Sequence, residues 1–170
     1  MLKKILVSGA LFSGALATPT LAANIVDTAK ADGSFTKLLA ANQAAGTASI
    51  LEGPGPFTVF APNDAAFAKA PRDKLAMLMK PENLTKLKVT LANHVVTGLL
   101  TENQIDSGLD KAGAVVVTAA NNMPLIIRRE GGVLTVNGAH VIKGPMKVDN
   151  GLIYVVDAVI LPAMPLQPTY

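Results

Sequence analysis

Two histidines are the side chains of this sequence best suited to proton transfer or metal binding near neutral pH. His94 and His140 are far apart in the chain, and no third ligand lies at helical or hairpin spacing from either of them. The sequence contains no cysteine, which excludes thiol chemistry. No serine lies in a Gly-x-Ser-x-Gly motif, and the carboxylates form no pair at a catalytic spacing. We therefore expect a protein that is not an enzyme and that holds no metal ion and no cofactor.

His94 follows Leu87 by seven residues and Leu91 by three, so in a helix it shares their inward face. A buried imidazole of this kind has two interpretations. It is either a ligand contact or pH-sensitive group, or a core histidine that is satisfied by one acceptor and holds its helix to a sheet. His140 follows a predicted tight turn, and we expect it on the surface.

The stretch GPFTVFAPNDAAFAKAP places polar residues at a bend between a strand and a helix. Asn63 is positioned to accept hydrogen bonds from the free N–H groups of a helix, and Asp64 suits the first turn of that helix. The corner either caps the helix or also displays these two side chains to an adhesive partner. Asp157 lies in the apolar run YVVDAVIL, where a carboxylate needs an internal partner or an exposed edge.

Residues 1–22 have the pattern of a secretory signal peptide. MLKK is basic, ILVSGALFSGALA is apolar but too short for a stable anchor, and TLAA offers small residues for cleavage after Ala22 or Ala23. A retained membrane anchor is the alternative, although Ser, Gly and Thr interrupt the apolar run. The sequence thus predicts a secreted protein, periplasmic or extracellular, with no stable membrane anchor after cleavage.

The mature chain is close to electrical neutrality. The full sequence has 15 Lys and Arg residues and 12 Asp and Glu residues. Loss of Lys3 and Lys4 with the signal peptide leaves 15 minus 2, or 13, bases against 12 acids, a net charge of +1. We interpret the bases as scattered along the sequence and not gathered in a block. We therefore expect no nucleic acid partner and no binding to an anionic membrane.

The order of the predicted elements favours an α+β fold in one domain. The helices come first. One begins near Ile25 and is broken by Gly33, and a second is capped by Ser34 and ended by Gly46. Further helices are expected over 64–70, 72–79 and 83–94.

Apolar alternation from Gly113 onward predicts the strands AVVVTAA, PLIIRR, VLTVNGAHVIKG and GLIYVVDAVILP. Another strand, FTVFA, lies earlier, at 57–61. Asn137-Gly138 is a two-residue hairpin turn, and Asn150-Gly151 is another tight turn. We expect antiparallel strands in a sheet or sandwich that helices cover on one side, followed by an irregular tail over 163–170.

Three segments together resemble the fasciclin domain family, in the order and at the separations usual for that family. GPFTVFAPNDAAF resembles its first signature, LANHVVTG its histidine-containing segment, and NGLIYVVDAVILP its second signature. The resemblance extends over a domain at 23–162. Family members often have Tyr before the histidine, where this sequence has Asn93. The positions that match the family pattern are Asn63, Asp64, Phe67, His94, Asn150, Gly151 and Asp157.

The resemblance implies a wedge-shaped β-sandwich flanked by several helices. It also implies a role in adhesion, with an extracellular or cell-surface protein or a polysaccharide as partner. The matching residues are then either structural or part of a partner-binding surface. An alternative within the family is a carrier of an apolar small molecule, such as a carotenoid or a lipid, held between the sheet and its helical cover. Met77, Met79 and Met123 could supply contacts to such a ligand, or simply fill the core.

Overall fold

The computed structural model describes residues 23–161. The predicted signal peptide at 1–22 and the predicted tail at 163–170 lie outside the described residues. The helices are α1 (Ile25–Asp32), α2 (Thr36–Ala45), α3 (Ala48–Leu51), α4 (Asp64–Lys69), α5 (Arg72–Leu78), a short 3-10 turn (Pro81–Asn83), α6 (Leu84–Ala92) and α7 (Glu102–Gly108). The strands are β1 (Phe57–Pro62), β2 (Val95–Thr97), β3 (Ala114–Thr118), β4 (Pro124–Glu130), β5 (Val133–Val136), β6 (Ala139–Val148) and β7 (Gly151–Val156).

The strands form one sheet in the order β2-β1-β7-β6-β5-β4-β3. All neighbours are antiparallel except β1 and β7, which run parallel from the pair Phe57 and Gly151 to the pair Pro62 and Val156. The expectation of a purely antiparallel sheet was therefore wrong for the β1–β7 pair. The early strand β1 is inserted beside the last strand because both carry apolar side chains on both faces, and such strands belong in the middle of a covered sheet.

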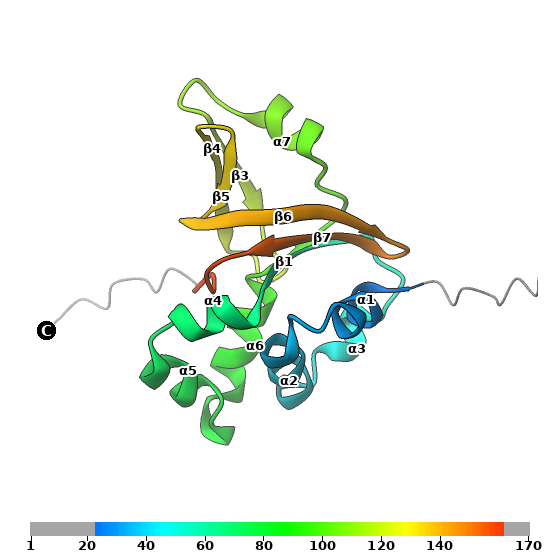
Figure 1. Cartoon of the computed structure of the whole chain (residues 1–170), viewed down its shortest axis with the longest axis vertical. Coiled ribbons are helices and arrows are strands. Elements are labelled where there is room, and N and C mark those ends of the chain that lie inside the picture. The colour runs from blue at the N-terminus through cyan, green and yellow to red at the C-terminus, as the bar shows by residue number, and fades with distance from the viewer. Residues whose placement is uncertain (1–22, 162–170) are drawn as a thin grey trace, which may run out of the picture.

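The sheet folds over on itself at β6. The pairing of β6 with β7 is irregular between Val141 and Met146, where bulges bend the strand. The two edge strands of the sheet are β2 and β3. An isolated bridge joins Val96, in β2, to Ala119, just after β3. The two ends of the sheet therefore meet and enclose an interior, while α1 to α6 cover the outer face of β1 and β7 (Figure 1). This arrangement confirms the predicted α+β wedge.

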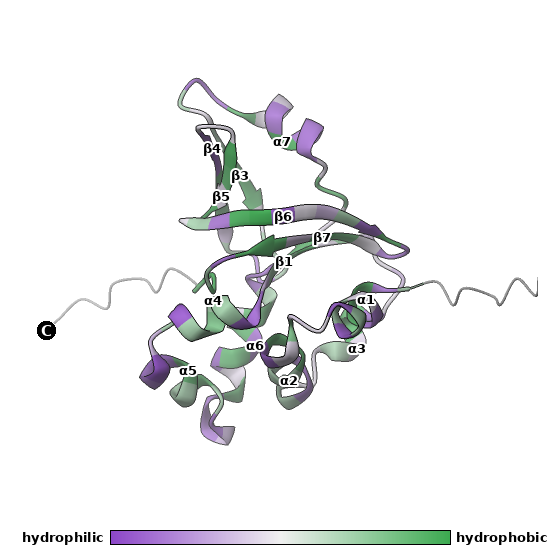
Figure 2. Cartoon of the chain, viewed as in Figure 1, coloured by the Kyte–Doolittle hydropathy of each residue, from purple (hydrophilic) through white to green (hydrophobic). Residues whose placement is uncertain are grey.

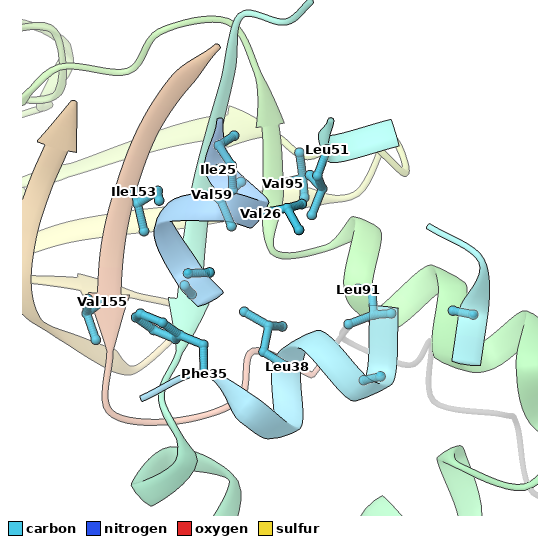
Figure 3. Close-up of a cluster of buried hydrophobic side chains, with 14 of the residues drawn as sticks. Ile25, Val26, Phe35, Leu38, Leu51, Val59, Leu91, Val95, Ile153 and Val155 are labelled. Atoms are coloured by element: carbon cyan, nitrogen blue, oxygen red, sulfur yellow. The ribbon is translucent and has the colours of Figure 1, made fainter. Parts of the chain in front are cut away.

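Two apolar cores lie on opposite faces of β1 and β7. Val59 and Ile153 face the helices, in a core that also contains Phe35 of the loop before α2 (Figure 3). Phe60 and Tyr154 face the sandwich interior, where their rings stack with centroids 5.4 Å apart. Because both faces are covered, β1 is buried almost throughout.

Local signals placed most element ends correctly. Gly33 and Gly46 end α1 and α2 in the left-handed conformation, and Asn137-Gly138 forms the β5–β6 turn with positive φ at both residues. The predicted last helix was too long. α6 ends at Ala92, and Val95 starts β2 because its backbone pairs with Val59 of β1.

Candidate functional site

Two adjacent side chains at the corner after β1 connect this strand to α4 and to α2. Asn63 Oδ1 accepts a hydrogen bond from the Ala66 N–H at 2.8 Å, which is the capping contact that the sequence predicts. Asp64 does not serve its own helix alone. Its carboxylate accepts from the Lys37 N–H at 2.9 Å and from the Thr36 hydroxyl at 2.7 Å, so it caps α2 from a distant part of the chain.

Ser34 was expected to cap α2, and this expectation was wrong. The N-cap position is Phe35, which makes no side-chain cap, and Phe35 is instead buried in the helix-side core. The Ser34 carbonyl accepts from the Asp64 N–H at 2.7 Å. Thus the start of α2 is connected to the start of α4 twice, through the Asp64 side chain and through the backbone bond between Asp64 and Ser34. Phe67, one turn into α4, is buried in the same core.

Removal of the Asp64 carboxylate is expected to lower the free energy of unfolding by about 1.5 kcal/mol, because two donors at the start of α2 lose their acceptor. Burial opposes ionisation of this carboxyl, but the hydrogen bonds from Lys37 and Thr36 outweigh it and hold its pKa below the ordinary 3.8. The contribution is therefore present above pH 3.8 and is lost as the pH falls further. Urea denaturation of Asp64→Ala tests this, with Asp73→Ala on the exposed surface of α5 as control. Equal stability of the two variants would contradict the assignment.

Asn150 connects four segments at the turn before β7. Its Oδ1 accepts from the Ile25 N–H at 3.0 Å, at the start of α1. Its Nδ2 donates to the carbonyls of Leu51 at 2.6 Å and Gly53 at 3.0 Å, after α3. Its own carbonyl accepts from the Phe57 N–H at 2.9 Å, at the start of β1. The side chain is buried, and these backbone partners engage its Oδ1 and both hydrogens of its Nδ2.

Asp157 lies one residue beyond the end of β7. Its carboxylate accepts from the His140 N–H at 2.9 Å and pairs with Lys69 Nζ at 3.3 Å, at the end of α4. The His140 ring is exposed, with Nδ1 3.6 Å from the same carboxylate. Burial opposes ionisation of Asp157, but the His140 N–H and Lys69 prevail and lower its pKa. The internal partner that the sequence requires for this acid is therefore present.

His94 follows α6 and is almost completely buried. Its Nδ1 lies 2.7 Å from the Thr90 carbonyl, and its Nε2 lies 2.9 Å from the Ile160 N–H. Since a carbonyl only accepts and an N–H only donates, the ring is neutral with its proton on Nδ1. Burial lowers the pKa of His94 from 6.5 to about 4, against the opposite effect of the Thr90 carbonyl. The imidazole holds α6 to the segment after β7.

This buried histidine predicts a stability that depends on pH. The unfolded chain takes up a proton on the imidazole near pH 6.5, whereas the folded chain does so only near pH 4. Protonation therefore favours unfolding throughout this window. We expect the free energy of unfolding to fall by about 3 kcal/mol as the pH goes from 6.5 to 4.

Urea denaturation at a series of pH values measures this change. His94→Gln has no titrating ring at this position, so its stability is expected to be nearly flat over the window. His140→Gln removes the exposed histidine and is expected to keep the wild-type slope. A slope that survives in His94→Gln would show that another group carries it.

Asn93 holds the position where family members often have Tyr. It is buried, and its Nδ2 makes a long contact of 3.4 Å to the Ile160 carbonyl. Its Oδ1 has no hydrogen-bond donor among residues 23–161. Asn93 and His94 thus contact the same residue, Ile160. The Asn93 side-chain amide donates to its carbonyl, and the His94 ring accepts from its N–H.

An apolar cavity of about 60 Å³ lies between α1, α2 and the sheet. Val26, Leu38, Leu91 and Ile153 line it, and their side chains converge from helices and strands in Figure 3. The His94 ring also reaches its wall. Cavities that enclose drug-sized ligands measure about 300–1,000 Å³. The closed structure therefore has room for a few atoms, and a carotenoid would require the helices to leave the sheet.

The family described as Fasciclin domain has a model that matches residues 33–162. The chain belongs to the fasciclin family. The match begins after α1, so the predicted boundary at residue 23 stays a prediction. In Synechocystis sp. (strain ATCC 27184 / PCC 6803 / Kazusa), Protein sll1483 is 39% identical over 143 residues, which cover 84% of this chain and 76% of that protein. From the same organism, Uncharacterized protein sll1735 is 38% identical over 138 residues, 81% of this chain and 97% of that protein.

The fasciclin fold is also found in a solved structure, a FAS1 domain pair from the insect cell adhesion molecule Fasciclin I. It superposes with a TM-score of 0.70 at 18% identity over 84% of this chain, and the chain spans about half (51%) of that pair. At this identity the likeness concerns the fold. Human periostin contains a segment that is 31% identical over 111 residues, 65% of this chain and 13% of periostin.

The matched fasciclin positions do not converge on one site. Asn63, Asp64 and Phe67 share the corner after β1, and Lys69 links the far end of α4 to Asp157. Asn150 and His94 lie elsewhere, each with its own backbone partners. Within residues 23–161 no three His, Cys, Asp or Glu side chains gather as metal ligands. In the same part of the chain, no helix has the length and apolarity needed to cross a membrane.

Sequence reasoning missed α3, α7 and β2, and among the surface features of this fasciclin domain it missed a basic helical end. The bases were read as scattered, yet residues 69–88 contain six of them and two acids. A running sum of charge along the chain would have revealed this segment. What it could not reveal is that α5 projects away from the sheet, so that these charges are exposed (Figure 1).

Proposed function

We propose that this fasciclin domain is an exported, non-catalytic adhesion module that binds a protein or polysaccharide partner at the cell surface or in the surrounding matrix. The observation that carries the proposal is its membership of a family whose fold occurs in an insect cell adhesion molecule. The absence of a predicted catalytic constellation in the sequence agrees with it. Export, to the periplasm or beyond the cell, belongs to the proposal as well.

In this proposal the matched family residues serve the fold. Each polar side chain among them bonds to backbone groups: Asn63 to its own helix, and Asn150 to the distant segments of Ile25 and Leu51. Their role is to hold rigid a surface that other residues present to the partner. Variants at these positions should therefore lose binding only to the extent that they unfold.

Attachment of cells that lack the gene tests the proposal. The deletion strain is expected to attach poorly to its natural surface, and a plasmid copy of the wild-type gene is expected to restore attachment. Purified protein added from outside should restore it too, because an exported module acts outside the cell. Normal attachment of the deletion strain would overturn the proposal.

A carrier of a small apolar molecule is the second candidate, which the apolar lining of the cavity beneath α1 and α2 favours. Native mass spectrometry of protein recovered from its own host separates the two candidates. A discrete extra mass that denaturation releases supports a carrier. A bare mass that begins near Ala23 supports the exported adhesion module.

A further inference from the structure

The bases of this domain are concentrated in one segment. Residues 69–88 carry six bases and two acids, a net charge of +4. The remaining residues of 23–161 carry seven bases and ten acids, a net charge of −3. The sum, +1, hides this separation. A domain with so small a total charge can still present one strongly basic surface.

The basic end consists of α5, the 3-10 turn after it and the first turns of α6. Among residues 23–161, four of its cations are exposed and have no carboxylate oxygen within 4.0 Å: Arg72, Lys74, Lys86 and Lys88. The two others are paired, Lys69 with Asp157 and Lys80 with Glu82. The unpaired charges are therefore available to an external anion.

Apolar side chains project from the same end. α5 has no buried residue, and Met77 and Met79 are 56% and 43% exposed. Val89 of α6 is exposed as well. Leu75 and Leu78 contact the helix-side core from α5 and fix the helix to the domain. Cations and flexible thioether side chains are thus presented together on an anchored helix.

α7 lies at the far end of the long axis from α5 (Figures 1 and 2). With the loop that follows it, α7 contains Glu102, Asp106, Asp110 and Lys111, three acids minus one base, or a net charge of −2. Arg129 neutralises Asp106 at 2.7 Å. An anionic surface would attract the α5 end much more strongly than the α7 end, so the charge distribution favours one orientation of the domain.

We propose that the α5–α6 end is a docking surface for an anionic lipid membrane. Lysine and arginine side chains bind the phosphate-bearing headgroups, while Met77 and Met79 enter the interface between headgroups and acyl chains. An acidic polysaccharide fits less well, because residues 68–153 contain no Phe, Tyr or Trp on which a sugar ring could stack. The domain then stands on the membrane with its sandwich and α7 directed away from it.

Sedimentation with lipid vesicles tests this docking. The exported protein is mixed with vesicles of phosphatidylcholine alone or with phosphatidylglycerol in equal part, at low and at physiological salt. We expect binding to the anionic vesicles that weakens as salt is added, and none to phosphatidylcholine. Replacement of Lys74, Lys86 and Lys88 by Gln should reduce the partition coefficient by roughly a hundredfold.

Two matched variants make the test specific. Lys111, Arg128 and Lys147 are exposed cations elsewhere, and their joint replacement by Gln changes the net charge equally. This control is expected to bind within about threefold of wild type. Met77→Ser with Met79→Ser should bind roughly tenfold more weakly, whereas Val116→Ser, on the exposed face of β3, should bind normally.

Three results would overturn the proposal: absence of binding to the anionic vesicles, equal loss in both triple variants, or undiminished binding of the methionine variant. Undiminished binding of the methionine variant would show that the surface binds anions in general. Binding to a soluble acidic polysaccharide would then identify the alternative partner. The outcome is independent of the adhesion proposal. A deletion strain can fail to attach whether or not the purified domain binds lipid.

Discussion

Replacement of Asn150 by aspartate is expected to lower the free energy of unfolding by about 4 kcal/mol at pH 7. The substitution changes no volume and keeps the Oδ1 that accepts from the Ile25 N–H. It replaces Nδ2, which donates to Leu51 and Gly53, with an oxygen that faces both carbonyls. A buried anion opposite two acceptors is among the most costly defects of a protein interior.

The pH dependence of this variant identifies the cause. The carbonyls raise the pKa of an aspartate at this position, and a protonated carboxyl can donate to one of them. The folded variant then holds its proton to a higher pH than the unfolded chain. Its stability relative to wild type should therefore recover as the pH falls. Asn103→Asp, on α7, adds the same charge at an exposed site and is expected to change stability by less than about 0.5 kcal/mol.

Replacement of Gly151 by alanine is expected to cost about 4 kcal/mol or to prevent folding. A Cβ at this position would overlap the Phe57 carbonyl oxygen and lie 2.8 Å from its carbon. Both atoms belong to the backbone of β1, so no side-chain rotation relieves the overlap. The first pair of the parallel β1–β7 ladder would have to separate, and the Asn150 contacts beside it would be lost.

Gly108→Ala is the matched control for this steric argument. There the new Cβ would lie 3.0 Å from Val115 Cγ2, the end of a side chain that can rotate away. We expect its stability to stay within about 1 kcal/mol of wild type. Thermal unfolding followed by circular dichroism compares the two variants. Similar midpoints would show that β1 can move away from β7 at little cost.

The elements predicted correctly from sequence are those whose signals are local. Gly33 and Gly46 end helices because each takes a positive φ, and Asn137-Gly138 closes a hairpin for the same reason. Asn63 caps α4 through an atom of its own turn. In all these cases the residues that decide the conformation are within four positions of one another.

The errors concern partners that the chain brings from far away. Ser34 was expected to cap α2, but the cap is Asp64, which reaches it only once β1 is in place. The pairing of β1 with β7 depends on segments at opposite ends of the domain, and apolar alternation does not say which strands become neighbours. Likewise, the sequence placed His94 in the core but could not identify the Ile160 N–H as its donor.

The candidate site shows the same contrast between local signals and partners that are distant in the chain. The resemblance named Asn150 and Asp157, but their partners, Leu51, Gly53 and Lys69, carried no signal in the sequence. The basic end is the opposite case, because its charges were visible in the sequence and its exposure was not. Projection of α5 from the helical layer is a property of the packed structure (Figure 2).

The position of β7 between β1 and β6 also governs when the chain can fold. β1 has no parallel neighbour until Val156 has been synthesised, and the helix-side core lacks Ile153 and Val155 until then. A nascent chain therefore cannot complete the helix-side core before β7 is available, and contacts of such long sequence separation form slowly. Under the export proposed above, this delay would keep the chain unfolded enough to pass through a translocation channel until β7 has been synthesised.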